Sequence, residues 1–323
     1  MSPRALITGI AGQDGTYLTE LLVGKGYEVF GLLGPEPGDF EAWAARFGGA
    51  VHGLAGDLTD MTSLMSAVEA SHPDEVYNFA AMSFPIGSWE RAVATTDINA
   101  TGVVRLLEAV RTLAPDARFF QPSSAEIFGN STEVPQTELT PLRPRSPYGA
   151  TKAFDLFITA EYRQSYGMHA SSGILFNHES PRRPPIFVTR KITDGVARIK
   201  AGLATELRLG NLDAKRDWGF AGDYVEAMWL MLQQPEASDF VIATGEVHTV
   251  REFCEVAFAR AGLEWQRYVK VDPALLRPDD ADTLRGEASR ARRVLGWEPK
   301  VGFADLVAMM VDADLDRVSG QHE

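Results

Sequence analysis

The chain has 323 residues, of which 45% are hydrophobic and 23% are charged, as is ordinary for a globular protein. Asp and Glu number 44 against 31 Lys and Arg, and the net charge of −13 argues against nucleic acid as the main partner. At about 150 residues per domain, this length predicts two domains or one large one.

Three further features concern location and metal binding. No apolar run approaches the ~20 residues of a membrane span, and the first apolar run starts too early to leave room for a signal peptide. Cys254 is the only cysteine, so no intrachain disulfide can form, and we expect a cytoplasmic protein. The six histidines lack metal-ligand spacing, so we expect surface or packing roles for them and no metal site.

Short apolar runs alternate with helical patterns through the first half of the chain. The expected strands are 5–8, 28–33, 51–54, 75–79, 118–121 and 169–176. The expected helices are 16–25, 61–69, 99–111 and 149–165. This alternation predicts an α/β fold with a doubly wound parallel Rossmann sheet.

The pattern changes after residue 176. A loop composition at 180–185 is followed by helical patterns at 188–201, 223–234 and 250–261 and by an expected strand at 240–244. We therefore expect residues 1–176, with about 212–245, to form a dinucleotide-binding domain. Residues 177–211 and 246–323 are expected to form a smaller α+β substrate-binding domain.

A glycine-rich turn links the first expected strand to the first expected helix. It contains Gly9, Gly12, Gln13, Asp14 and Gly15. Strand, glycine turn and helix in this order are typical of a dinucleotide site, because glycines let the backbone approach a pyrophosphate at the helix N-terminus. The alternative is an ordinary tight turn.

Residues that follow the expected strands should line one cleft, because parallel sheets bind ligands beyond the carboxyl ends of their strands. They are Asp57, Leu58, Phe79, Ala80, Ala81, Ser83 and the segment from Ser123 to Glu126. Asp57 is a candidate adenine contact, and its alternative is a helix or turn cap.

Tyr148 and Lys152 give the most specific chemical signal. They stand one helical turn apart and project from the same face. The lysine charge favours the phenolate, so we expect Tyr148 to act as a base well below its usual pKa of about 10. With the Ser124 hydroxyl and the Glu126 carboxylate, this set could oxidise a sugar alcohol and move a proton on the neighbouring carbon. The alternative for Glu126 is a solvated loop carboxylate.

Long stretches of the chain resemble the extended short-chain dehydrogenase/reductases, and more closely the GDP-mannose 4,6-dehydratase family. The resemblance runs nearly end to end. Its specific stretches are LITGIAGQDG (6–15), PRSPY (144–148), GILFNHESPR (173–182), FVTRK (187–191), LGNLDAKRDWG (209–219), DYVEAMW (223–229), RP (277–278) and LGW (295–297).

This resemblance implies an NAD(P)-dependent hydro-lyase with a redox-neutral reaction. Tyr148 takes the proton of the sugar 4-hydroxyl while hydride leaves C4 for the nicotinamide. Ser124, where the family usually has threonine, bonds O4, and Lys152 also holds the nicotinamide ribose. Glu126 removes the C5 proton and helps the 6-hydroxyl leave as water, and the hydride then returns to C6 to give a 4-keto-6-deoxy sugar.

The resemblance also implies a nucleoside-diphosphate sugar as the partner. Arginine forks and a lysine point charge suit a pyrophosphate, although each basic residue taken singly is equally consistent with a surface salt bridge. The implied substrate-binding residues are Ser83, Asn177, Glu179, Val188, Lys191, Arg216 and Arg277. Secondary candidates are Arg182, Arg183 and Arg190.

The chain departs from the family after the strand expected at 28–33. The family typically carries an Arg-Arg-Ser-Ser stretch there, which holds the 2′-phosphate of NADP and helps to form a tetramer. This chain has GPEPG (34–38), in which Glu36 would repel a phosphate but could accept a hydrogen bond from a ribose 2′-hydroxyl. We therefore expect NAD to be favoured over NADP, and a homodimer more than a homotetramer.

A second departure lies at 81–85, where the family usually has Ala-Ala-Gln-Ser. Met82 removes an amide from this segment, and Ala125 replaces a hydroxyl residue. These changes suggest a modified sugar pocket, for mannose, another hexose or a heptose. The alternative is neutral drift with water filling the space.

Two other functions stay open. Ser123-Ser124-Ala125 also resembles the segment of sugar 4-epimerases, in which Tyr148 and Lys152 would serve equally. Glu126 favours the dehydratase, because an epimerase needs no base for C5. A catalytically silent NAD-sensing or scaffold protein is the third possibility, and the intact set of four side chains argues against it.

Overall fold

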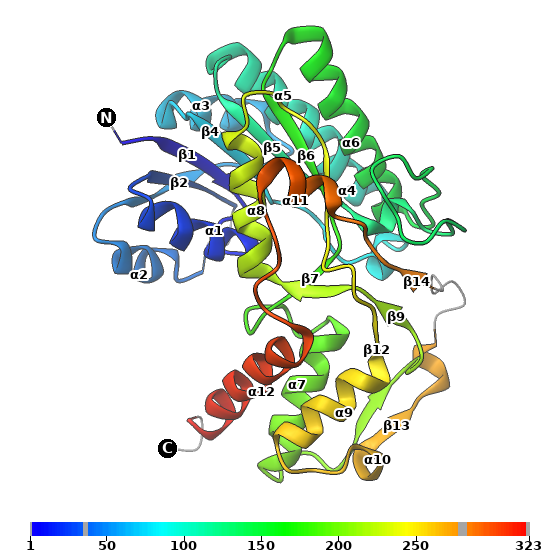
Figure 1. The fold of residues 1–323 in the computed structure, drawn as a ribbon. Coiled ribbons are helices and arrows are strands. Elements are labelled where there is room, and N and C mark those ends of the chain that lie inside the picture. Colours follow the sequence, from blue (N-terminus) through cyan, green and yellow to red (C-terminus); the bar gives the residue numbers. More distant parts are fainter. Residues whose placement is uncertain (1, 35–37, 277–282, 321–323) are drawn as a thin grey trace.

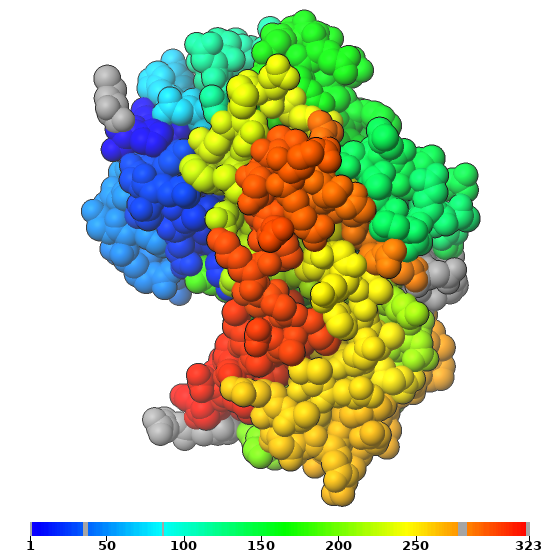
Figure 2. All heavy atoms as spheres, viewed as in Figure 1, coloured from blue at the N-terminus to red at the C-terminus, as the bar shows by residue number. Residues whose placement is uncertain are grey.

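The computed structural model describes residues 2–34, 38–276 and 283–320. The chain forms a larger lobe around a central sheet and a smaller lobe below it (Figure 1). The space-filling view shows a hollow between the N-terminal part of the larger lobe and the C-terminal helix of the smaller one (Figure 2).

A seven-stranded parallel sheet forms the larger lobe. Its strands in spatial order are β11 (Phe240–Ile242), β6 (Ala170–Leu175), β5 (Arg118–Ser124), β4 (Glu75–Asn78), β1 (Arg4–Thr8), β2 (Glu28–Leu33) and β3 (Val51–Ala55). Every neighbouring pair is parallel. The predicted fold class is confirmed, and the order reverses between β1 and β4, where such sheets bind ligands.

Helices cover both faces of the sheet, because successive strand residues point to opposite sides. Ala5 and Ile7 pack in one hydrophobic cluster with α1 (Gln13–Gly24) and α8 (Ala221–Gln233). Leu6 packs in a second cluster with α3 (Met61–Ser71) and α5 (Gly102–Leu113). Apolar side chains on both faces explain why the strands appear in the sequence as continuous apolar runs.

The smaller lobe has its own hydrophobic cluster. The cluster draws on α7 (Val188–Lys200), α9 (Val250–Arg260) and α12 (Phe303–Ser319), and on the paired strands β8 (Leu207–Leu209) and β13 (Val269–Val271). The chain returns to the larger lobe through α11 (Ser289–Leu295), whose Ala291 and Leu295 pack in the cluster of α8 (Figure 1). The predicted division of the chain into a dinucleotide-binding domain and a substrate-binding domain stays a prediction.

Apart from the long helix α6, the remaining elements are short, and most of them lie in the connections between the helices and strands already described. They are α2 (Phe40–Ala44), η1 (Ala45–Phe47), η2 (Ile86–Ser88), α4 (Ala92–Thr96), η3 (Asp97–Thr101), η4 (Ala125–Ile127), α6 (Pro147–Tyr166), β7 (Asn177–Glu179), β9 (Lys215–Arg216), β10 (Trp218–Phe220), β12 (His248–Thr249), α10 (Trp265–Tyr268), η5 (Pro273–Leu275) and β14 (Thr283–Leu284). Of these, only the 20-residue α6 is long.

Local chemistry sets the boundaries of α6, the helix that carries Tyr148 and Lys152. The Ser146 hydroxyl accepts a hydrogen bond from the backbone N–H of Gly149 at 3.0 Å, and Pro147 occupies the first helical turn. Gly167 ends the helix in the left-handed conformation with φ of 69°. The start of α6 therefore places Tyr148 at the carboxyl end of the sheet.

Within the described ranges, no helix combines the length and the apolar character that a bilayer crossing requires. In the same ranges, no group of three or more His, Cys, Asp or Glu side chains could hold a metal ion.

Asp314 is a buried carboxylate that joins α12 to α7. It accepts a hydrogen bond from the Thr193 hydroxyl at 2.7 Å and pairs with Arg190 at 2.8 Å. Asp314→Asn should lower the free energy of unfolding by about 3 kcal/mol, because it leaves a buried guanidinium without its anion. Urea denaturation measures this. Asp312 lies on α12 as well, and its exposed carboxylate pairs with Arg260 at the end of α9, so Asp312→Asn should lower the free energy of unfolding far less than Asp314→Asn. Equal losses in the two variants would contradict the assignment.

Candidate active site

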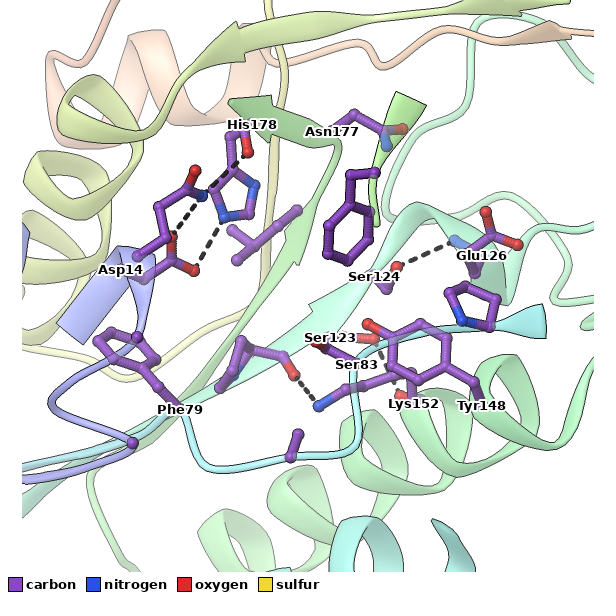
Figure 3. A pocket seen from close by; sticks show the side chains of 18 of the residues that line it. Asp14, Phe79, Ser83, Ser123, Ser124, Glu126, Tyr148, Lys152, Asn177 and His178 are labelled. Atoms are coloured by element: carbon purple, nitrogen blue, oxygen red, sulfur yellow. Dashed lines mark hydrogen bonds and ion pairs between the residues drawn. The ribbon is translucent and has the colours of Figure 1, made fainter. Parts of the chain in front are cut away.

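A cavity of about 340 Å³ opens where β1, β4, β5 and β6 end. It receives side chains from the glycine turn, the loop after β4, the end of β5, helix α6 and the segment after β6 (Figure 3). The predicted residues that line it are Gly9, Gly12, Gln13, Asp14, Gly15, Phe79, Ala80, Ala81, Ser83, Ser124, Glu126, Tyr148, Lys152 and Asn177.

The glycine turn suits a dinucleotide. Gly9 adopts a φ of 65°, and a Cβ at this position would lie 2.8 Å from the backbone nitrogen of Ala80. Helix α1 begins after Gly12, and no side chain caps its first turn. Its first N–H groups are therefore available to a phosphate, as a nicotinamide dinucleotide requires.

Tyr148 lies in the wall of the cavity, where only 9% of its surface is exposed. Burial raises the pKa of its phenol, while the charge of Lys152, a hydrogen bond with Ser124 and the charge of Arg183 lower it. The net direction is upward from 10. The expectation of a phenol pKa well below 10 is therefore wrong for the chain by itself, because desolvation outweighs the nearby positive charge.

Lys152 lies beneath Tyr148 on the same helix. Its Nζ donates hydrogen bonds to the backbone oxygen of Pro122 at 3.0 Å and to Asp155 Oδ2 at 3.1 Å. Figure 3 shows the Lys152 and Tyr148 side chains converging on one side of the cavity, close to Ser123 and Ser83. The predicted pairing of phenol and ammonium in one place is thus present in the structure.

Glu126 comes from η4, directly after β5. Its backbone N–H donates to the Ser124 hydroxyl at 3.3 Å, which fixes the turn between the two residues. Besides burial, the negative charge of Glu126 contributes to the raised pKa of Tyr148, and the two side chains line the same cavity. Glu126 also lines an adjoining cavity of about 140 Å³, and it is therefore a cavity residue and not only a solvated loop carboxylate.

Asp14 and His178 form an ion pair across the cavity from Tyr148 (Figure 3). His178 Nε2 lies 2.9 Å from Asp14 Oδ2, and its ring stacks on Tyr224 with the centroids 4.8 Å apart. Burial alone lowers the pKa of His178, but Asp14 raises it above 6.5 overall. Burial alone raises the pKa of Asp14, but His178 lowers it below 3.8 overall. The pair connects the glycine turn to β7.

His178 packs against Tyr224, as predicted for a packing residue, and it also lines the cavity, which the sequence analysis did not predict. The signal was present in the sequence, because His178 follows the strand expected at 169–176 and stands beside Asn177. Residues that follow parallel strands are expected to line the ligand cleft, and the same argument applies to His178.

Arg183, a secondary candidate from the sequence, also reaches the cavity. Its Nε lies 3.1 Å from Glu179 Oε2, and its guanidinium lies 3.6 Å from the ring centroid of Phe187. Glu179 is 2% exposed and also accepts a hydrogen bond from the Thr189 hydroxyl at 2.6 Å. The carboxylate of Glu179 therefore orients Arg183 and Thr189, besides lining the adjoining cavity.

The adjoining cavity gathers most of the residues predicted to bind the nucleotide sugar. Asn177, Glu179, Val188 and Arg216 line it, together with Gly210, Asn211, Trp218 and Leu275. Asn177 and Glu126 line both cavities, which places the two spaces side by side. A ligand could therefore extend from one into the other.

Some predicted residues lie elsewhere. Lys191 on α7 lines neither cavity, and neither do Asp57 and Leu58. Asp57 Oδ1 accepts hydrogen bonds from the backbone and hydroxyl of Thr59, both at 2.8 Å, as the turn-cap alternative predicts. Leu58 is buried at 4% exposure. Glu36 and Arg277 lie outside the described residues.

The loop after β4 carries the substituted segment, and Asn99 of η3 holds it. Asn99 Oδ1 accepts a hydrogen bond from the backbone N–H of Met82 at 2.8 Å, and its Nδ2 donates to the Met82 oxygen at 3.1 Å. Backbone contacts do not depend on the side chain, so this loop can keep its course with Met82 in place of an amide residue.

A doubly wound sheet, a glycine turn and a tyrosine–lysine pair beside a serine and a glutamate define an extended short-chain dehydrogenase/reductase. The family model described as GDP-mannose 4,6 dehydratase matches residues 6–310. The chain therefore belongs to the GDP-mannose 4,6-dehydratase family, whose members are hydro-lyases that require NAD or NADP.

Two curated relatives agree with this assignment. GDP-mannose 4,6 dehydratase 2 of Arabidopsis thaliana is 53% identical over 331 residues, which cover 98% of this chain and 88% of the plant protein. The GDP-mannose 4,6 dehydratase of Homo sapiens is 45% identical over 339 residues, covering 97% and 91% of the two chains.

Solved structures support the fold at lower identity. DesIV, a dTDP-glucose 4,6-dehydratase from Streptomyces venezuelae with NAD and TYD bound, has a TM-score of 0.87 at 25% identity and covers 98% of each chain. The Thermus thermophilus UDP-glucose 4-epimerase in complex with NAD has a TM-score of 0.85 at 29% identity, covering 96% of this chain and 98% of the other.

Proposed function

We propose that this protein converts GDP-mannose, or a closely related GDP-hexose or GDP-heptose, to the 4-keto-6-deoxy sugar nucleotide. The observation that carries the proposal is that Glu126 and Tyr148 line one cavity, which also holds the glycine turn. An acid–base group for C5 beside one for O4 is what elimination of water across C5 and C6 requires.

We assign one task to each side chain. Tyr148 takes the proton of the 4-hydroxyl, with the Ser124 hydroxyl bonding O4 and Lys152 holding positive charge below the phenol. A bound nicotinamide dinucleotide supplies reversible acceptance of hydride from C4 and its return to C6. Glu126 removes the C5 proton, which the 4-ketone acidifies, and gives a proton to the departing 6-hydroxyl.

The diphosphate and nucleoside are assigned to the adjoining cavity. Arg216 and Asn177 line this space, and Val188 and Leu275 offer apolar surface there. Arg183 reaches the first cavity, and its charge partly opposes the rise that burial causes in the pKa of Tyr148. Arg183 in the first cavity and Arg216 in the adjoining one supply positive charge for an anionic ligand, despite the net charge of −13.

One assay separates the three functions considered from the sequence. The protein is incubated with GDP-mannose and NAD or NADP in D₂O, and then with a panel of other nucleotide sugars. A dehydratase gives a 4-keto product with deuterium at C5, whereas a 4-epimerase gives a C4 epimer with its C5–H bond intact. No turnover of any sugar in the panel would favour a sensing or scaffold protein and would refute the proposal.

NAD is expected to bind more tightly than NADP. The support is the replacement of the family's two arginines by GPEPG, with Glu36 suited to a ribose 2′-hydroxyl. Quenching of protein fluorescence gives both dissociation constants, and Glu36→Ser should narrow the difference because it removes the charge that repels the 2′-phosphate. A tenfold or greater advantage for NADP would refute this preference.

We expect two copies of the chain to pair through the face formed by α4 and α6. Val93 is 86% exposed, Phe157 60% and Phe154 41%. An apolar groove of about 530 Å³ beside Phe154 runs between α6 and the continuous run of α4, η3 and α5. Phe157→Glu should shift the mass in solution from dimer to monomer, as measured by light scattering. Leu139→Glu, at a 91% exposed site that belongs to neither helix, is the control. A mass of four chains for the parent would favour the tetramer instead.

A cytoplasmic location of the protein stays a prediction.

A further inference from the structure

A fully buried carboxylate lies one helical turn beyond Lys152. Asp155 belongs to α6, and its side chain has no exposed surface. Asp155 Oδ2 accepts hydrogen bonds from Lys152 Nζ at 3.1 Å and from Gln121 Nε2 at 3.3 Å. Within the described ranges its Oδ1 has no hydrogen-bond partner. An ion pair with so little solvent around it keeps most of its mutual attraction.

Neutral polar side chains complete the layer below the cavity. Gln121 Oε1 accepts a hydrogen bond from Asn78 Nδ2 at 2.8 Å, and Asn78 Oδ1 accepts one from the Thr8 hydroxyl at 2.7 Å. This row runs through β5, β4 and β1, whose ends border the cavity. Lys152 is held at two points, Asp155 and the backbone oxygen of Pro122, which leaves one of its three N–H groups for a ligand.

Among the described residues, few charges act on Asp155 and on the Tyr148 phenol, which Arg183 also influences. Lys152 is the cation that acts on Asp155, and the groups of α6 and η4 that share the cavity are Tyr148 and Glu126. The charged groups on the other helices packed against α6 are paired elsewhere: Asp97 of η3 with Arg105, and Glu108 of α5 with Arg111. Burial raises the pKa of Asp155 to about 6, with Lys152 and Gln121 acting in the opposite direction.

This pairing changes what Lys152 can do for Tyr148. An unpaired ammonium below a phenol favours the phenolate by direct attraction. A carboxylate 3.1 Å from the same ammonium cancels part of that attraction, since the phenolate then faces a nearly neutral pair. The spacing of Tyr148 and Lys152 in the sequence, taken alone, predicts that the whole lysine charge lowers the pKa of the phenol.

We propose that Asp155 is a positioning residue, which anchors the Lys152 ammonium beneath Tyr148 and balances part of its charge. The inference rests on the proposed function, because that function makes Tyr148 the base. Asp155 touches neither cavity, so it acts through Lys152 and not on the sugar. This role also gives a reason why the buried polar side chains of Thr8, Asn78 and Gln121 lead to a charged residue, Asp155.

The test is a titration of the Tyr148 phenol in the full-length protein saturated with NAD. Tyrosinate absorbance is recorded against pH, and the difference from Tyr148→Phe isolates this one phenol among the 8 tyrosines. In Asp155→Asn the midpoint should fall by about one pH unit, because the lysine charge is no longer balanced. The control is Asp314→Asn, which removes a different buried carboxylate and should leave the midpoint where it is in the parent.

An unchanged or higher midpoint in Asp155→Asn overturns the inference. If circular dichroism shows that this variant does not fold, Asp155→Ser takes its place, with room for a water where the carboxylate was, and the same downward shift is expected. The titration uses no sugar, so its result does not depend on the proposed reaction. A chain that dehydrates GDP-mannose but shows no shift refutes the role of Asp155 alone.

Discussion

Glu126→Gln is expected to stop dehydration while oxidation at C4 continues. The amide keeps the size of the side chain but cannot take the C5 proton, so turnover to the 4-keto-6-deoxy product should fall by about 10²–10⁴-fold. Hydride transfer uses Tyr148 and Lys152, which the substitution leaves in place. Reduced nicotinamide should therefore accumulate on adding GDP-mannose, visible in its absorbance band, and deuterium should not enter C5 from D₂O.

The matched control for this variant is Glu133→Gln. Glu133 is exposed, stands seven residues after Glu126 and does not line the cavity. Its substitution therefore tests the effect of removing a negative charge close in sequence but outside the cavity. Its turnover should equal that of the parent. Retained turnover in Glu126→Gln would show that another group removes the C5 proton, and the proposed division of labour would then fail.

Tyr148→Phe should abolish both stages of the reaction. Without the phenol no group takes the 4-hydroxyl proton, so neither reduced nicotinamide nor 4-keto product should form, and turnover should fall by about 10²–10⁴-fold. Binding of the nucleotide sugar should be nearly unchanged, because Asn177, Val188 and Arg216, three of the predicted nucleotide-sugar contacts, line the adjoining cavity. Single-turnover absorbance and calorimetric titration measure the two quantities.

The pH dependence of the parent adds a second measurement to this prediction. Burial raises the pKa of Tyr148, so its base form gains population as the pH rises, and kcat/KM should increase from neutral toward alkaline pH. Tyr166→Phe is the control, because Tyr166 lies on the same helix but is 57% exposed. It should keep both the rate and the pH profile of the parent. Reduced nicotinamide formed by Tyr148→Phe would contradict the assignment of the base.

The two substitutions together identify the order of events. Glu126→Gln is expected to stop after the oxidation, and Tyr148→Phe before it. An epimerase would lose activity only with Tyr148, since it has no proton to move at C5. The pair of variants therefore tests the choice between the two reactions independently of product analysis.

Much of the fold was predictable because its signals are local. The predicted strands 5–8, 28–33 and 51–54 match β1, β2 and β3 to within one residue at either end. Predictions were poorer where several short elements meet: α4, the π-helical turn η3 and α5 form one continuous run in which only 99–111 was expected. Helix α12 was not predicted, although Leu306, Val307, Met310 and Val311 recur at helical spacing.

The sequence by itself determined the class of fold, the glycine turn and the membership of Ser124, Glu126, Tyr148 and Lys152 in one cavity. Strand alternation and the four-residue spacing of a helix are properties of neighbouring residues, so they can be read along the chain. Only the tertiary structure decided the partners of these groups: Asp155 for Lys152, His178 for Asp14 and Glu179 for Arg183. It also decided the direction of the Tyr148 pKa, because desolvation and charge depend on distant segments that folding brings together.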